Sequence, residues 1–236
     1  MFKQIIAHRG ESIQCPENTI PSFEEAFALG ADGIECDLQL TRDNVGVIFH
    51  DRTLEKKTGE QVSISQLTFS EVRKKDLGSW KSAKWAGVSI PTIEEALAVI
   101  PGGKVIHVEL KCGPEGIDVL ARALASTPIA QSQLTITGFD LGVGEACKRR
   151  FPNVPFLLNG LEFDYDRIST SSIDGVATYY GRAVFEQVRS RGLRYRMGNI
   201  NTRDEIETAY QNGVEYIDTD DVAFVVDYSR NTRRDA

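Results

Sequence analysis

Short apolar runs alternate with helical patterns along the whole chain of 236 residues. Leaving one hairpin aside, eight runs have the length and composition of strands, at 5–8, 33–40, 104–111, 133–138, 155–159, 173–177, 195–200 and 215–219. Helical patterns accompany them at 19–29, 92–100, 116–126, 141–151, 181–191, 202–212 and 222–229. This alternation is typical of a parallel sheet covered by helices. Eight such strands predict a (β/α)8 TIM barrel, whose active site lies where the strands end, at the C-terminal mouth.

An open, doubly wound sheet would give the same alternation. Dinucleotide-binding members of that class carry a G-x-G-x-x-G loop after the first strand, whereas this chain has His8, Arg9 and Gly10 at that place. A chain of this length with 41% hydrophobic residues can bury roughly three quarters of its unfolded surface, which is enough for one large core. We therefore predict a single TIM-barrel domain over residues 1–236.

The second barrel strand, 33–40, is followed closely by another apolar run at 45–50. Only four residues, 41–44, separate the two runs, and a parallel crossover needs a dozen or more. The pair is therefore predicted to be an antiparallel hairpin that extends the barrel and returns His50 to the mouth where His8 ends the first strand. Residues 51–91, which contain both tryptophans, break the alternation and predict a small insertion.

Carboxylates occupy one face of two predicted strands. Glu35 and Asp37 alternate with apolar neighbours, and Glu109 alternates with apolar residues in the run KVIHVELK. Side chains two apart on a strand share a face, so all three carboxylates can point into the barrel. A hard oxygen site without thiols suits Mg2+ or Ca2+ better than zinc. The alternative is that these carboxylates face solvent or pair with lysines.

Two histidines at strand ends complete a chemically coherent set. His8 and His50 can move protons to and from the attacking and leaving oxygens of a phosphate ester, because histidine titrates near neutral pH. Arg9 and Lys111 can add positive charge beside a divalent cation. His107 lies deeper in its strand, and we expect a hydrogen-bonded core histidine or a partner of the site there.

Charge and composition narrow the possible partners. The formal net charge of -7 argues against a nucleic-acid or membrane-surface binder and leaves a small-molecule substrate. No signal peptide and no apolar run long enough to cross a bilayer is visible, so a cytoplasmic location is expected. The four cysteines form no CxxC pair and are expected to be free thiols. The sequence carries no signal for an oligomeric state.

Several motifs occur in a specific order in the N-terminal half. They are AHRG at 7–10, PENT at 16–19, GADGIECDLQLT at 30–41, VIFHD at 47–51, DLGSW with IPTIEEAL within 76–97, and VELK at 108–111. Weaker matches follow at TGFD, 137–140, and at GVEYIDTDD near the C-terminus. This series resembles the glycerophosphodiester phosphodiesterase family of the phospholipase-C-like phosphodiesterase superfamily, and the resemblance covers the whole chain.

The resemblance implies an activity and a role for each site residue. The expected reaction is metal-dependent hydrolysis of glycerophosphodiesters to an alcohol and glycerol 3-phosphate, and residues 51–91 would cap the barrel mouth. The implied roles are a metal site at Glu35, Asp37 and Glu109, an acid/base pair at His8 and His50, phosphate contacts from Arg9 and Lys111, and supporting loop residues at Glu17 and Asn18.

One segment departs from the family pattern. Where many members have a W-T-V-N-like segment at the end of the penultimate strand, this chain has Gly198 in the tryptophan position and keeps the asparagine as Asn201. A missing indole leaves room, so a phospholipase-D-like or cyclising enzyme that acts on lysophospholipids is the alternative function. Phe139, Tyr179 or Trp80 could compensate for the indole or could be core residues. A non-catalytic binder of phosphate compounds is a third hypothesis, but it would require a broken acid/base set.

Overall fold

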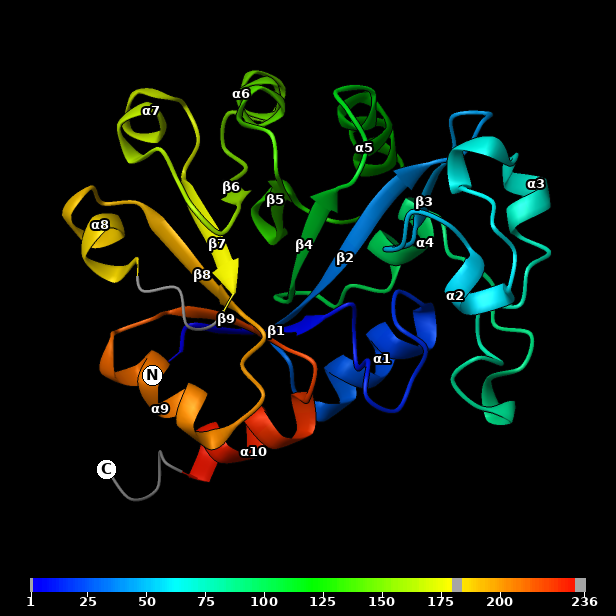
Figure 1. Cartoon of the computed structure of the whole chain (residues 1–236), viewed down its shortest axis with the longest axis horizontal. Helices are drawn as coiled ribbons and strands as arrows, with labels where there is room; N and C mark the ends of the chain where they lie inside the picture. The colour runs from blue at the N-terminus through cyan, green and yellow to red at the C-terminus, as the bar shows by residue number, and fades with distance from the viewer. Residues whose placement is uncertain (1, 180–183, 232–236) are drawn as a thin grey trace.

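The computed structural model describes residues 2–179 and 184–231, and its strands form a closed barrel (Figure 1). Hydrogen bonds run through the order β1-β9-β8-β7-β6-β5-β4-β2, and pairing of β1 with β2 closes the ring. All pairings within the ring are parallel. The barrel strands are β1 Gln4–His8, β2 Gly33–Leu40, β4 Val105–Leu110, β5 Leu134–Gly138, β6 Phe156–Asn159, β7 Gly175–Tyr179, β8 Arg194–Gly198 and β9 Tyr216–Thr219. The TIM-barrel prediction is confirmed.

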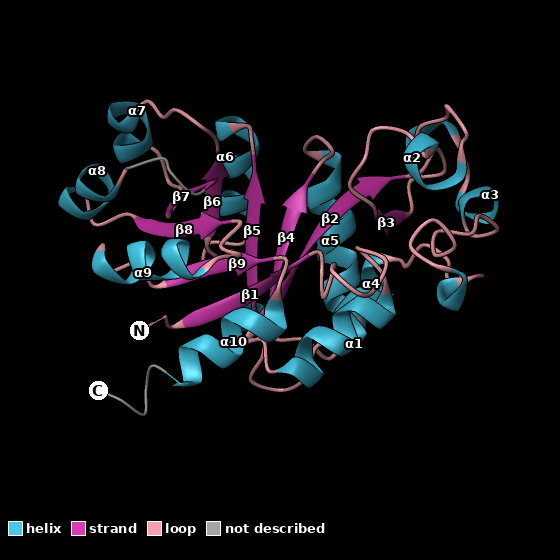
Figure 2. Cartoon of the chain, turned by 60° about the horizontal axis from the view of Figure 1, so that its bottom comes forward, coloured by secondary structure: helices cyan, strands magenta, loops and turns pink. Residues whose placement is uncertain are grey.

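Helices lie outside the strands, as the colouring by secondary structure makes clear (Figure 2). They are α1 Ile20–Leu29, α2 Glu55–Thr58, α3 Phe69–Val72, α4 Ile93–Ala98, α5 Glu115–Ser126, α6 Leu141–Arg150, α7 Tyr165–Thr170, α8 Phe185–Ser190, α9 Arg203–Gln211 and α10 Val222–Asn231. Short 3-10 helices lie at Ile64–Gln66, Ala83–Trp85 and Gln131–Gln133. The helix predicted at 181–191 begins in residues outside the described part of the chain.

Two barrel strands have boundaries that differ from the prediction by two residues, and the other barrel strands agree to within one residue at each end. The run predicted at 195–200 ends at Gly198, because Asn199 adopts a left-handed conformation with φ of 57°. The run predicted at 173–177 corresponds to β7, which begins and ends two residues later. The Asp174 carboxylate accepts a hydrogen bond from the backbone N–H of Phe156, so it lies before the strand rather than in it.

The alternation in β2 divides its side chains between the two sides of the barrel wall. Ile34, Cys36 and Leu38 are fully buried in the layer shared with the helices. Glu35 and Asp37 point the other way, into the barrel, and stand in register with His107 and Glu109 of β4. The helix-facing residues contribute the hydrophobic burial, and the barrel interior is left free for polar groups.

The hairpin strand, β3 Gly46–Ile48, pairs antiparallel with the outer end of β2, as predicted. Residues 51–91 continue from it and pack around a small apolar cluster of their own, which includes Phe49, Leu54 and Ile64. Their helices α2 and α3 lie beside the β2–β3 hairpin, at one side of the barrel (Figures 1 and 2). Arg73 donates to Glu95 over 2.6 and 2.8 Å and so ties this segment to α4.

Two further sequence predictions concern composition. The four cysteines are free; three are buried and Cys112 is half-buried. Among the helices formed by the described residues, we find none that is both long and apolar enough to span a bilayer.

Candidate active site

Three acidic side chains converge at the C-terminal mouth of the barrel. Glu35, Asp37 and Glu109 each offer a carboxylate oxygen, and these oxygens lie within 4.8 Å of one another. All three residues are buried. Their strands place them together because Asp37 of β2 is in register with Glu109 of β4. Three buried carboxylate oxygens at this separation fit a hard divalent cation.

Cationic and amide groups hold this acidic cluster in place. The Lys111 ammonium lies 3.3 Å from Asp37 Oδ1 and also contacts Glu109 Oε1. Asn18 donates from its amide nitrogen to Asp37 Oδ2 over 2.7 Å and accepts the backbone N–H of Asp37 at 3.3 Å. Arg9 contributes through its backbone N–H, which donates to Glu35 Oε2 at 3.2 Å, and through its guanidinium, which lies 3.5 Å from Asp37.

The two neighbouring carboxylates of β2 respond differently to this environment. Burial and the charge of Asp37 raise the pKa of Glu35 to about 8. Burial also acts to raise the pKa of Asp37, but the charges of Lys111, Arg9 and His50 outweigh it and leave that pKa below its usual value. The raised pKa of Glu35 means that the cluster does not readily carry all of its negative charges at neutral pH unless a cation is added.

His8 ends β1 and lies between two acidic groups. Its Nδ1 atom is 2.7 Å from Asp220 Oδ1, and its Nε2 atom is 4.0 Å from Glu35 Oε2. Burial works to lower the pKa of His8, but the hydrogen bond with Asp220 and the charge of Glu35 outweigh it and raise that pKa to about 9. Asp220 therefore fixes the ring and leaves Nε2 facing the acidic cluster.

His50 reaches the same cluster from the hairpin. The backbone N–H of Phe49 donates to the Asp37 carbonyl at 2.8 Å, so the chain stays paired to β2 just before His50. Its Nδ1 atom lies 3.2 Å from Asp51 Oδ1, again leaving Nε2 free of that contact. His8 Nε2 lies beside Glu35, and His50 follows the residue that pairs with Asp37, so the two histidines approach the acidic pair from two different strands.

Glu17 connects the loop after β1 to the insertion. Its Oε1 atom accepts from Arg9 Nη1 at 3.4 Å and lies 3.2 Å from Lys57 Nζ. Lys57 in turn stacks over the ring of Trp80, 3.5 Å from its centroid. A second link runs from Lys81, whose ammonium donates to the Ser12 carbonyl at 2.7 Å.

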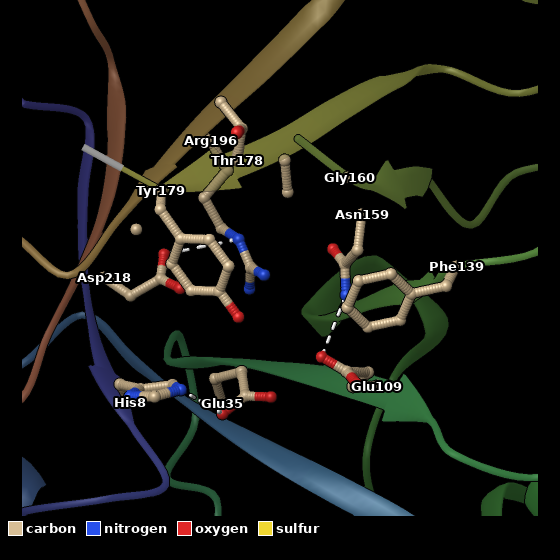
Figure 3. Close-up of a pocket in the computed structure, with 12 residues that line it drawn as sticks. His8, Glu35, Glu109, Phe139, Asn159, Gly160, Thr178, Tyr179, Arg196 and Asp218 are labelled. Atoms are coloured by element: carbon tan, nitrogen blue, oxygen red, sulfur yellow. Dashed lines mark hydrogen bonds and ion pairs between the residues drawn. The ribbon is translucent and has the colours of Figure 1, made fainter. Parts of the chain in front are cut away.

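An open cavity extends from His8, Glu35 and Glu109 toward β5–β9, and its empty space of about 380 Å3 includes the part open to solvent (Figure 3). Six of its other wall residues were not singled out by the sequence, namely Asn159, Gly160, Ala177, Thr178, Arg196 and Asp218. Gly198, Phe139 and Tyr179, which the sequence analysis named for the missing indole, also line the cavity. Phe139 and Tyr179 are 59% and 48% exposed, so neither is a core residue.

The structure thus brings the nine predicted site residues to one end of the barrel and adds Asp220 as a partner of His8. Asp220 follows β9 within the motif GVEYIDTDD, whose alternating acids Asp218 and Asp220 were a usable signal. The inward Arg196 and Asn159 gave no such signal, because a single polar residue in an apolar run is also compatible with a loop end.

The fold and this cluster together define a (β/α)8 enzyme with its active site at the C-terminal mouth of the barrel. Residues 8–223 match the model of the glycerophosphoryl diester phosphodiesterase family. The chain belongs to this family and is a phosphoric diester hydrolase, as the resemblance predicted.

Relatives of known name cover nearly the whole chain. A glycerophosphodiester phosphodiesterase from Caldanaerobacter subterraneus subsp. tengcongensis is 29% identical over 238 residues, which span 96% of this chain and 97% of the relative. A phosphodiesterase from Oleispira antarctica, solved in complex with the product sn-glycerol-3-phosphate, is 26% identical with a TM-score of 0.88 and 96% coverage of both chains. A Thermotoga maritima glycerophosphodiester phosphodiesterase, 21% identical, has a TM-score of 0.80 over 97% of this chain and 99% of its own and supports the fold alone.

Proposed function

We propose that this protein hydrolyses glycerophosphodiesters to an alcohol and glycerol 3-phosphate in a metal-dependent reaction with two histidines as acid and base. The observation that carries the proposal is the cluster of Glu35, Asp37 and Glu109 within 4.8 Å, flanked by His8 and His50. The glycerol 3-phosphate bound to the Oleispira relative supports the assignment of the product.

A divalent ion held by the three carboxylates, Mg2+ or Ca2+, would supply positive charge for the nonbridging phosphate oxygens. Arg9 and Lys111 add charge on the same side, since both contact the acidic cluster. Glu17 and Asn18 orient this arrangement, Glu17 by its ion pair with Arg9 and Asn18 by its two bonds to Asp37.

The histidines perform the proton transfers through their Nε2 atoms, because acids engage both Nδ1 atoms. One imidazole takes the proton from the attacking oxygen as that oxygen bonds to phosphorus. The other gives a proton to the alcohol oxygen as its bond to phosphorus breaks. Positioned acid and base groups of this kind are worth about 10^2 to 10^4 each in rate.

The segment 51–91 is proposed to cap the mouth beside the phosphate contacts. Lys57 and Trp80 support this role, since Lys57 bridges the insertion to Glu17. Trp85 adds a hydrogen bond of 2.9 Å to the carbonyl of Gln14 in the loop after β1.

The test is a metal and product assay. Purified protein, treated with chelator, should lose hydrolysis of glycerophosphocholine and regain it with Mg2+ or Ca2+, and the released product should be glycerol 3-phosphate. Hydrolysis that persists without metal, or release of a cyclic product instead, contradicts the proposal. A protein that binds the substrate and never cleaves it would be the non-catalytic binder.

Lysophospholipids are a second candidate substrate, favoured by exposed apolar side chains beyond β5, β6 and β7. Phe139, Leu161 and Tyr179 are 59%, 50% and 48% exposed and could contact an acyl chain. Comparing turnover of glycerophosphocholine with that of lysophosphatidylcholine separates the two candidates, and a higher kcat/KM for the lipid supports the second.

A further inference from the structure

A buried arginine lies inside the barrel, below the mouth. Arg196 of β8 is 5% exposed, and its neighbours Tyr195 and Met197 face the helices, so its own side chain points inward. Its Nη1 atom donates to His107 Nδ1 at 3.2 Å, and its Nε atom lies 3.3 Å from Asp218 Oδ1. Burying a guanidinium is unfavourable unless its donors are satisfied, and one neutral imidazole and one carboxylate leave it only partly satisfied.

Buried polar atoms around this arginine are incompletely hydrogen-bonded among the described residues. Arg196 Nε and Asp218 Oδ1 form an ion pair with each other at 3.3 Å but no hydrogen bond, and the Asn159 oxygen and the Thr178 hydroxyl have no hydrogen-bond partner among these residues. The Asn159 amide nitrogen donates to Glu109 Oε2 at 2.9 Å, so its oxygen is the atom left over. Arg196, Asp218 and Asn159 line the same open cavity, and Figure 3 shows them converging on it from β6, β8 and β9. Unsatisfied buried groups that converge on one cavity are expected where a ligand completes the bonding.

Gly198 keeps this cavity open without being needed for the backbone. Its φ angle does not lie in the left-handed region, so the backbone conformation at this position is open to residues other than glycine. A Cβ atom there would lie 3.5 Å from both Asp218 Oδ2 and the Thr178 carbonyl, which is ordinary contact. A larger side chain would therefore fit the strand and would occupy the space beside Asp218 instead.

The unsatisfied atoms define the chemistry of the ligand. The Arg196–Asp218 pair and the Asn159 oxygen offer both donor and acceptor groups to the cavity, and hydroxyl groups match them because they both donate and accept. A second anionic group is disfavoured, because Glu35, Glu109 and Asp218 also line the cavity. A cationic head group would face the Arg196 guanidinium at the cavity floor.

We propose that Arg196, Asp218 and Asn159 form a subsite for adjacent hydroxyl groups on the glycerol portion of the substrate, with Arg196 as the specificity-determining residue. This subsite rests on the proposed function, because the cavity runs from the carboxylate cluster, where the phosphate is proposed to bind, toward β6–β9. His107 holds the guanidinium in position and has no contact with the ligand.

Calorimetry on the Mg2+-loaded protein tests the subsite with glycerol 3-phosphate, phosphocholine and inorganic phosphate. Arg196→Met is expected to weaken glycerol 3-phosphate binding at least tenfold and phosphate binding less than twofold. The matched control is Arg194→Met, an exposed arginine two residues earlier on the same strand, which should change neither. Equal losses for both ligands, or an unchanged affinity for glycerol 3-phosphate, overturn the proposal. Phosphocholine binding more tightly than glycerol 3-phosphate also overturns it.

A second variant covers the possibility that Arg196→Met does not fold. Gly198→Leu fills the cavity from the same strand, beside Asp218, and should likewise cost at least tenfold in glycerol 3-phosphate affinity, with Gly198→Ala giving a smaller loss. Hydrolysis by the wild-type protein is measured on the same preparation. Absent hydrolysis refutes the proposed function, whereas hydrolysis with unchanged glycerol 3-phosphate affinity in Gly198→Leu refutes the subsite alone.

Discussion

The two halves of the barrel mouth are built in different ways. In the first half, from β1, β2, β3 and β4, each carboxylate is held by a second group: Asn18 binds Asp37 at two atoms, and Lys111 contacts both Asp37 and Glu109. In the second half, from β5 to β9, the Asn159 oxygen and the Thr178 hydroxyl are buried without a hydrogen-bond partner among the residues described, and Arg196 pairs with Asp218 without a hydrogen bond. In the first half, Arg9 Nε and Glu109 Oε1 also lack a hydrogen bond to the described residues, but each lies beside an opposite charge. The first half is therefore organised by its own charges before any ligand arrives, whereas the neutral atoms of the second half leave their bonding for a ligand to complete.

The largest expected effect tests whether the first half performs the chemistry. His8→Ala and His50→Ala should each lower kcat by about 10^2 to 10^4, because each removes one proton-transfer group. Steady-state kinetics on glycerophosphocholine with Mg2+ measures the loss, and a thermal melt checks that the fold survives. A variant that retains kcat within a few-fold of the wild type would show that its histidine has another role.

Asp220 connects the two halves of the mouth, because it follows β9 in the second half and orients His8 in the first half. Asp220→Asn should lower kcat by about 10- to 100-fold, the range typical when a partner that orients a functional histidine is changed. Asp221→Asn is the matched control. Its side chain accepts the backbone N–H of Phe224 at 3.1 Å, and asparagine serves such a helix N-terminus as well as aspartate does. Equal kcat values in the two variants would show that Asp220 has no role in the reaction, and the catalytic residues would then all belong to the first half.

The insertion, residues 51–91, supports the first half of the mouth if the ion pair between Lys57 and Glu17 contributes to substrate binding. Lys57→Met should raise KM about fivefold, which corresponds to about 1 kcal/mol for a largely buried ion pair. Lys74→Met is its control, since that lysine lies in the same insertion with an exposed side chain, whereas Lys56 lies 3.4 Å from Asp51, the partner of His50. If both variants keep the wild-type KM, the proposed capping role of residues 51–91 is wrong.

The same division explains what could be predicted from the sequence. His8, Glu35, Asp37, His50 and Glu109 stand at strand ends or alternate with apolar residues, so period and topology alone bring them to one mouth. The four-residue connection at 41–44 was enough to predict the antiparallel return of His50, and β3 confirms the hairpin.

The contacts of the second half depend on where strands distant in sequence fall around the ring. Arg196 and His107 are 89 positions apart, and no local pattern indicates that the two side chains meet. Asp220 and His8 are 212 positions apart and meet only because β9 pairs with β1 when the barrel closes. The expectation that His107 is a hydrogen-bonded core residue agrees with its contact to Arg196, although the identity of that partner required the structure.

The smallest expected effect compares one threonine from each half. Thr41 Oγ1 in the β2–β3 turn donates to Asp43 Oδ1 at 2.7 Å and accepts the Val45 N–H at 3.0 Å. Thr178 on β7 is equally buried, but its hydroxyl has no hydrogen-bond partner among the residues described. Valine has nearly the same shape as threonine, so the substitution tests the hydroxyl and little else.

Thr41→Val should therefore destabilise the protein by about 1 to 2 kcal/mol, because it leaves the Val45 N–H without its side-chain partner and removes one of the two donors to Asp43 Oδ1. Thr178→Val should stabilise it by up to about 1 kcal/mol, because it replaces an unsatisfied buried hydroxyl with a methyl group. In a chain of this size, thermal melts should move by about 2 to 4 °C per kcal/mol, in opposite directions for the two variants. An equal loss of stability in Thr178→Val and Thr41→Val would mean that the Thr178 hydroxyl is hydrogen-bonded after all. The contrast between the halves would then rest on Asn159 and the Arg196–Asp218 pair alone.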